Sequence, residues 1–199
     1  MSNHSHQENH PGGNQQAFLS KIAFLDSAMR QRTLPPEEII NHLPIKTDSQ
    51  ILDAGAGSGY LTIPAAKQTE ATVFALDMDQ QMLEVIDNKA KAENIKNIQL
   101  LARKIEELPL AEKEVDFVLA SLILHEVSSL PNVLKEFNRV LKTGGYFLCL
   151  EYEKEESSIQ GPPLAIRISS ATMEKKFNSC WLSGREENQP ERINLYHDC

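Results

Sequence analysis

The chain has 199 residues, a net charge of −8 at neutral pH and 24% charged residues. That length suits one domain with a sizeable core. The acidic balance disfavours a nucleic-acid backbone as the main partner, because that partner would need a basic face. The three cysteines are scattered, which predicts a reducing compartment and no zinc site. A polar start and the lack of an apolar run of about 18 residues predict a cytoplasmic protein without a signal peptide or membrane span.

The first 49 residues precede the predicted core. Residues 1–16 are polar and contain three histidines, so we expect a disordered tail. Residues 17–31 place apolar side chains at helical spacing, which predicts a short helix that either packs on the body or forms a lid over a binding site. Pro35 and Pro36 suit the first turn of another helix, which we expect from Glu37 to Leu43.

A glycine-rich loop then follows a short apolar run. Gly55, Gly57 and Gly59 stand between a strand and a helix, where residues without a side chain let the backbone turn sharply and approach a ligand. The start of the next helix supplies free N–H groups at the same place. A second apolar run ends at Asp77, 24 positions after Asp53. A carboxylate about 20 residues beyond a glycine loop, at a strand end, commonly binds ribose hydroxyls.

Two residues decide which cofactor this loop fits. Tyr60 stands where the dinucleotide fingerprint has its third glycine, and Asp53 would repel a pyrophosphate. These residues argue against a nucleotide-dependent oxidoreductase, which is the third of our hypotheses. A P-loop is excluded because no Lys-Ser or Lys-Thr follows the glycines. A carboxylate would attract an ammonium group, and S-adenosylmethionine carries an ammonium, a sulfonium and a ribose but no phosphate.

Strands and helices alternate through the rest of the chain, which predicts a parallel sheet covered on both faces. A helix at 79–93 has Asp79 as its N-cap, and a helix at 130–141 has Ser129 as a possible cap and Gly144 at its end. The other expected elements are strands at 98–102, 115–121 and 146–152, a polar linker at 153–163, a helix at 170–178, and a last hairpin of residues 185–187 and 192–197.

Four segments in order resemble the motifs of class I S-adenosylmethionine-dependent methyltransferases. They are Leu52–Tyr60, Ala75–Leu83, Glu107–Val118 and Arg139–Phe147. The subfamily is the small-molecule type that includes the ubiquinone/menaquinone-pathway enzymes, and the match covers about residues 35–151. The resemblance implies a doubly wound, mostly parallel, seven-stranded Rossmann-like sheet. It further implies a single domain over residues 17–199, with N-terminal helices or a lid at 17–49, the cofactor-binding core at 50–152 and an acceptor-side segment at 153–199.

The resemblance also implies a cofactor site for S-adenosyl-L-methionine. We expect Asp53 to bind the amino group of the cofactor, and the backbone of Gly55 and Gly57 to contact its methionine part. Asp77 is expected to accept hydrogen bonds from the ribose hydroxyls, and Met78 to pack on the adenine. The other cofactor-binding residues that we expect are Gly59, Tyr60, Lys104, Ile105 and Ser121. Lys104-Ile105 occupies positions where the family usually has an Asp that contacts the adenine amine. A lysine cannot accept that hydrogen bond, so backbone groups of Lys104 or Ile105 are expected to serve instead.

His125, just past the fourth strand, is the candidate base or acceptor-orienting group, or else a structural histidine near a helix start. DNA bases and amides are disfavoured as acceptors, because Ser121 to Leu124 stands where the enzymes that methylate adenine N6, cytosine N4 or glutamine amides have Asn/Asp-Pro-Pro-Tyr/Phe. Arg167 is interpreted as an exposed arginine or as a contact for an anionic substrate. The leading hypothesis is therefore methyl transfer to an unidentified small molecule. The alternative is a protein that binds S-adenosylmethionine for regulation or for a partner, with little or no transfer.

Overall fold

The computed structural model describes residues 11–155, 161–181 and 191–197, and within them a six-stranded sheet has the order β3-β2-β1-β4-β5-β6. Every neighbouring pair of strands runs parallel. The strands are β1 (Ile51–Ala54), β2 (Val73–Asp77), β3 (Ile98–Ala102), β4 (Val115–Ser121), β5 (Leu141–Tyr152) and β6 (Glu191–His197). The helices are α1 (Pro11–Leu25), α2 (Ala28–Thr33), α3 (Pro36–Asn41), α4 (Thr62–Gln68), α5 (Gln80–Ala92), α6 (Leu130–Val140) and α7 (Ser170–Trp181).

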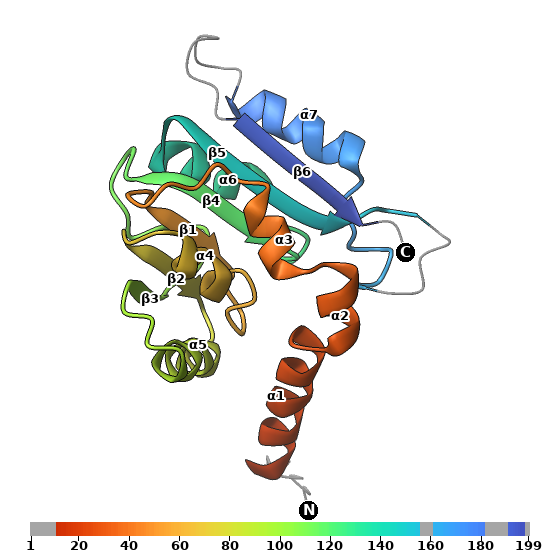
Figure 1. The fold of residues 1–199 in the computed structure, drawn as a ribbon. Helices are drawn as coiled ribbons and strands as arrows, with labels where there is room; N and C mark the ends of the chain where they lie inside the picture. The colour runs from red at the N-terminus through yellow and green to blue at the C-terminus, as the bar shows by residue number, and fades with distance from the viewer. Residues whose placement is uncertain (1–10, 156–160, 182–190, 198–199) are drawn as a thin grey trace, which may run out of the picture.

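Helices cover both faces of the sheet, as the alternation of strands and helices predicted (Figure 1). Successive side chains of β4 point to opposite faces, so Val118 packs in one cluster with Phe137 of α6 and Phe177 of α7. Phe117 packs in another with Ile40 of α3 and with α4. Because both faces are buried, the strands read as continuous apolar runs rather than alternating ones.

The expectation of seven strands is wrong for the part of the chain that the structure describes, where the sheet has six. Residues 191–197 form β6, which pairs parallel with β5 in the register Tyr146↔Glu191 to Tyr152↔His197. A parallel neighbour needs a crossover connection, and α7 lies between the two strands in the sequence. The predicted hairpin would pair residues 192–197 with residues 185–187, and the latter lie outside the described residues.

The N-terminal helices differ from the sequence prediction in their bounds. α1 begins at Pro11, inside the range expected as a tail, and proline suits a first helical position; residues 1–10 lie outside the described residues. The helix expected over residues 17–31 is divided at Asp26 and Ser27, because the Ser27 side chain caps α2 by accepting from the Arg30 N–H. α1 projects from the body (Figure 1), and Phe24 on it is 60% exposed.

The end of α6 also differs from the prediction. The helix stops at Val140, and the extended backbone of Leu141 begins β5 directly, so Gly144 does not end the helix. Gly144 instead has a φ of +72° inside β5, near a shift in register between β4 and β5. Ser129 is at the N-cap position, but its side chain makes no capping hydrogen bond.

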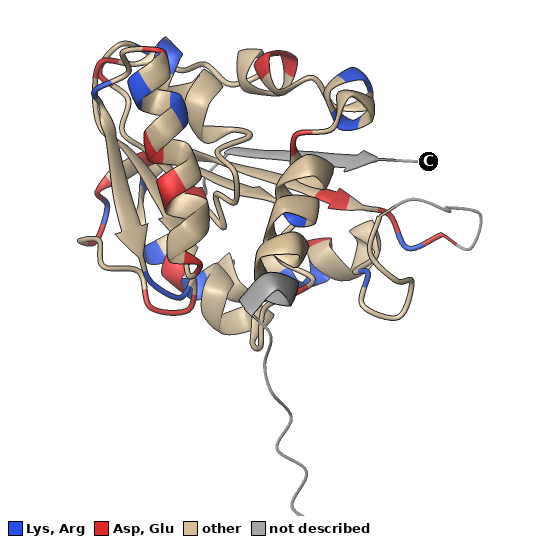
Figure 2. Ribbon diagram, turned by 90° about the horizontal axis from the view of Figure 1, so that it is seen from below, with Lys and Arg blue, Asp and Glu red and all other residues tan. Residues whose placement is uncertain are grey.

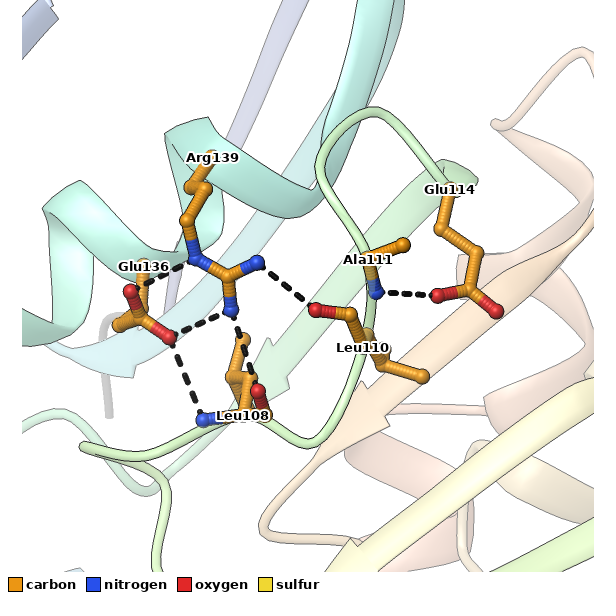
Figure 3. A network of polar contacts seen from close by, with 6 residues as sticks. All are labelled: Leu108, Leu110, Ala111, Glu114, Glu136 and Arg139. Atoms are coloured by element: carbon orange, nitrogen blue, oxygen red, sulfur yellow. Dashed lines mark hydrogen bonds and ion pairs between the residues drawn. The ribbon is translucent and has the colours of Figure 1, made fainter.

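Two of the motif segments are joined by Arg139 (Figure 3). Its guanidinium donates to both carboxylate oxygens of Glu136, and to the carbonyls of Leu108 and Leu110. Glu136 in turn accepts from the Leu108 N–H at 3.3 Å. The loop before β4 is thereby fixed to α6, which gives a physical reason for an arginine near the end of this helix.

Charges of both signs are interspersed over the described helices and loops (Figure 2). No helix in the described ranges has a stretch that is both long enough and apolar enough to cross a bilayer.

Candidate cofactor site

Two adjoining cavities lie at the carboxyl ends of the strands, where parallel sheets bind ligands. One, of about 270 Å³, is lined by residues after β2, β3 and β4, among them Met78, Lys104 and Ile105; we call it the β2–β3 cavity. The other, of about 100 Å³, lies over β1 and is called the β1 cavity; Arg30, Asp53 and Ser121 line it. Gly55, Asp77, Ile123 and Glu126 line both cavities. The two halves therefore form one crevice.

Asp77 fixes the glycine loop at the centre of the crevice. One of its carboxylate oxygens accepts from the Gly57 N–H at 2.8 Å, and the other accepts from the Asp79 N–H at 2.9 Å. Asp79 caps α5 by accepting from the Gln81 N–H, as predicted. Each carboxylate oxygen has two lone pairs, so Asp77 keeps acceptor capacity for ribose hydroxyls.

Gly55 is the place where the loop meets the turn after β4. Its φ is +76°, and a Cβ at this position would lie 2.5 Å from Cγ1 of Ile123. A side chain here would therefore suffer both backbone strain and a steric clash with the wall that the two cavities share. The glycine at this position is required by a close approach within the protein itself, before any ligand is considered.

Gly55→Ala is accordingly expected to destabilise the protein more than Gly144→Ala. Gly144 also has a positive φ, but a Cβ there would meet nothing within 4 Å. The variant Gly144→Ala therefore reports the cost of the backbone conformation alone. We expect Gly144→Ala to lower the free energy of unfolding by about 1–2 kcal/mol. Gly55→Ala should lower it by about 1–3 kcal/mol more. Urea denaturation of both variants measures the difference. Adding Ile123→Ala to Gly55→Ala should recover part of it, and equal losses in the two single variants would contradict the assigned contact.

Asp53 is 2% exposed, and its carboxylate accepts from the Thr62 hydroxyl at 2.6 Å. Burial, together with the nearby charge of Asp77, raises the pKa of Asp53 to about 6, although the Thr62 hydrogen bond opposes the shift. An ionised carboxylate in this place is held at a cost in free energy. A cationic ligand would reduce that cost.

Arg30 is a residue of the crevice that sequence reasoning missed. It comes from α2, is 8% exposed and lies with its guanidinium carbon 4.0 Å from the centre of the Tyr60 ring. Nη1 donates to the Leu25 carbonyl at 3.3 Å, while Nε is buried without a hydrogen-bond partner among the described residues. Burial lowers the pKa of Arg30, although the charges of Asp26 and Asp53 oppose the shift. No sequence motif marks this arginine, because only the fold carries α2 to the glycine loop.

Most of the other predicted cofactor residues lie in the crevice. Tyr60 lines the β1 cavity, and its hydroxyl donates to the Leu34 carbonyl; burial raises its pKa to about 12. The Ser121 hydroxyl is buried with no partner within the described ranges. Met78 is 74% exposed at the β2–β3 cavity. Gly59 lines neither cavity; it turns the chain at φ +84°, close to Ile86 of α5.

His125 lies beside the crevice without lining either cavity. Its side chain is 5% exposed, and Nδ1 lies 2.7 Å from a carboxylate oxygen of Glu151. Nε2 lies 3.8 Å from the carboxylate of Glu126, which lines both cavities. Burial alone would lower the pKa of His125. The hydrogen bond and charge of Glu151, with the charge of Glu126, outweigh burial and raise it.

The interpretation of Arg167 as an exposed arginine is wrong. Arg167 is 5% exposed, and its guanidinium donates to the carbonyls of Pro162 and Glu153. It also lies over the ring of Tyr152, 5.5 Å from the centre. Arg167 thereby supplies donors to two backbone carbonyls after β5, since buried carbonyls need a hydrogen-bond partner.

A three-residue contact ties the N-terminal helices to the glycine loop. Asp26 accepts from the Ser58 hydroxyl at 2.7 Å and from Lys89 of α5 at 2.8 Å, and Lys89 also donates to the Ser58 carbonyl. Lys21 and Leu25 of α1 line the β1 cavity. The end of α1 therefore forms a wall of the crevice, which is what a lid requires.

This doubly wound fold, with a glycine loop after β1, an acid at the end of β2 and a second, buried acid in β1, is that of the Rossmann-like methyltransferase class. The profile of the family described as "Methyltransferase domain" matches residues 45–193, so the chain belongs to that family. Its methyl donor is S-adenosyl-L-methionine.

Individual relatives agree with that assignment. The chain is 30% identical over 168 residues to a demethylmenaquinone methyltransferase of Staphylococcus carnosus, covering 80% of this chain and 69% of the relative. It is 35% identical over 117 residues to the corresponding enzyme of Staphylococcus saprophyticus, covering 58% of this chain and 49%, about half, of that relative. A solved methyltransferase from Aquifex aeolicus has a TM-score of 0.71 at 26% identity, covering 81% of this chain and 86% of that one.

Proposed function

We propose that the chain transfers the methyl group of S-adenosylmethionine to a small molecule bound at the mouth of the β1 cavity. One observation carries the mode of binding: two buried side chains of opposite charge, Arg30 and Asp53, line the same cavity. No ion pair joins them in the described part of the chain. An amino-acid group carries one ammonium and one carboxylate, so it complements both charges at once.

The residues present fit the cofactor along its whole length. Arg30 binds the carboxylate of the cofactor's methionine part, and Asp53 binds its ammonium group. Asp77 accepts hydrogen bonds from the ribose hydroxyls. The adenine occupies the β2–β3 cavity beside Met78, Lys104 and Ile105. Glu106 closes that cavity by accepting from the Ser128 hydroxyl and N–H, which joins the loops after β3 and β4.

The protein's part in the reaction is to position the acceptor and to take up its proton. When bound, S-adenosylmethionine would supply an electrophilic methyl group: the acceptor would give the electron pair of the new bond to the methyl carbon, and the sulfur would keep the pair of the broken carbon–sulfur bond. Holding the acceptor in line contributes most of the rate, with effective molarities that can reach about 10⁵ M. His125 accepts the acceptor's proton at Nε2, directly or through water, if that acceptor carries one.

The relatives' names make a reduced naphthoquinone the first acceptor to assay. Two enzymes that the chain resembles are named for demethylmenaquinone. Apolar side chains stand at the crevice and on α1, including Leu25, Leu122 and Ile123 in the β1 cavity and the exposed Phe24. They suit an apolar ring better than a charged acceptor.

Calorimetric titration with S-adenosylhomocysteine tests the proposal first. We expect binding at one site, and no binding of NADH or ATP because the buried Asp53 opposes phosphate. Formation of S-adenosylhomocysteine from S-adenosylmethionine and a short-chain demethylmenaquinol then tests transfer. Absence of binding would overturn the cofactor assignment. Binding without turnover on a panel of phenols, quinols, amines and thiols would instead favour a binding protein.

A further inference from the structure

Glu151 is buried in β5, and both of its carboxylate oxygens are engaged by the turn after β4. One oxygen accepts from the Leu124 N–H at 2.8 Å, and the other lies 2.7 Å from Nδ1 of His125. Glu151 itself is 2% exposed. The same turn contains Leu122 at φ +56°, a strained conformation for this residue, with its N–H bonded to the Leu150 carbonyl. Strand β5 thus holds the turn that lines both cavities.

These contacts fix which nitrogen of His125 carries the proton. An ionised carboxylate only accepts hydrogen bonds, so Nδ1 must be the donor, and the neutral ring then has its lone pair on Nε2. Nε2 lies on the side of Glu126, 3.8 Å from its carboxylate, and Glu126 lines the crevice where the two cavities join. The unprotonated nitrogen is therefore the one on the side of Glu126, which lines both cavities.

We propose that Glu151 is a positioning residue that holds His125 in the Nδ1–H form, with Nε2 as the basic nitrogen beside the crevice. The inference rests on the proposed function, in which Nε2 takes the acceptor's proton. Three charged groups act on the ring: Glu151 from β5, Glu126 from the turn itself, and Arg167 from the segment after β5. The two acids favour the protonated ring and Arg167 disfavours it.

Nitrogen NMR of the whole protein with ¹⁵N-labelled histidine tests the tautomer without an acceptor. The His125 signals are assigned by their loss in His125→Gln. In the wild type at alkaline pH we expect Nδ1 to be protonated and Nε2 unprotonated, with a titration midpoint above the ordinary value of about 6.5. Finding the proton on Nε2 of the neutral ring would overturn the proposal, and this measurement needs no folded Glu151 variant.

Glu151→Gln then tests the role of the charge. We expect the His125 midpoint to fall by one pH unit or more, because burial remains and the carboxylate is gone. Glu126→Gln is the matched control, which should lower the midpoint less and leave the proton on Nδ1. The acid limb of kcat/KM with the demethylmenaquinol probe should move with the midpoint in Glu151→Gln. An unchanged midpoint would contradict the proposal, whereas unchanged S-adenosylhomocysteine affinity keeps the cofactor assignment intact.

Discussion

Replacing Arg30 with Met is expected to weaken S-adenosylhomocysteine binding by about 30- to 4,000-fold, while 5′-methylthioadenosine loses less than about threefold. The first ligand carries the carboxylate that Arg30 binds, and the second has the same ribose and adenine but no amino-acid group. Removing one partner of a desolvated charge pair typically costs about 2–5 kcal/mol of binding free energy, and about 1.4 kcal/mol corresponds to a factor of ten. Calorimetric titration of both ligands measures the two losses separately.

The same helix provides the control. Arg32 lies two positions along α2 and is exposed, so Arg32→Met removes an equal charge without touching the cavity. It should change neither affinity by more than about twofold, because exposed charges are screened. An equal loss for both ligands in Arg30→Met would contradict the carboxylate assignment. It would show that Arg30 acts by supporting Tyr60 and α2 instead.

Arg30→Met is also informative about stability. A buried guanidinium with an unpartnered Nε is held at a cost, and apolar replacements of buried charges are often neutral or stabilising. We therefore expect the unfolding free energy of the empty protein to stay level or to rise. A fall would indicate that packing on the Tyr60 ring outweighs the desolvation of the charge.

The sequence predicted the central strands and the position of Asp77 beside the glycine loop well, because both depend on local sequence patterns. The strands at 98–102 and 115–121 have the predicted bounds, and Asp77 lies beside the glycine loop as the spacing required. Each of these follows from apolar runs and glycine positions within about 30 residues of one another. The same local logic failed at Gly144, where a glycine near a helix end lies inside β5 at a positive φ instead.

What the sequence did not predict depends on contacts between distant residues. Arg30 reaches the crevice only because α2 packs on Tyr60, 30 positions later, and Glu151 meets His125 across 26 positions. No spacing rule connects such pairs, since the fold alone brings the elements together. The strand predicted at 192–197 is present as β6, but its parallel pairing with β5 was not predicted, for a related reason. Whether a C-terminal segment pairs parallel or antiparallel depends on the connection before it, not on its own residues.

Asp53→Asn is expected to make the empty protein more stable at pH 7.5 and to bind S-adenosylhomocysteine at least about 100-fold more weakly. The folded-state pKa of Asp53 is about 6, above the ordinary value of 3.8. At pH 7.5 the carboxyl is therefore ionised in both states, and burying that charge costs free energy only in the folded one. A shift of one unit corresponds to about 1.4 kcal/mol, so we expect a gain of about 1–3 kcal/mol for the amide. The Thr62 hydroxyl can still donate to the amide oxygen.

The sign of the pH dependence distinguishes this cause from better packing. Between about pH 4 and 6 the folded protein binds more protons at Asp53 than the unfolded chain does, so this group makes stability fall as pH rises. The advantage of Asp53→Asn should consequently shrink on acidification and vanish near pH 4. Urea denaturation at pH 7.5, 6 and 4 measures it, with Asp48→Asn as an exposed control that should show no such trend. A variant no more stable than the wild type at pH 7.5 would show that the buried carboxylate is not strained.

Ligand binding should follow the opposite course with pH. Protonating Asp53 removes the charge that attracts the ammonium group, so S-adenosylhomocysteine affinity should decline as pH falls below about 6 in the wild type. In Asp53→Asn it should stay flat over the same range. The protein would then carry a destabilising acid because that acid selects a cationic ligand, a cost in stability that binding sites commonly impose.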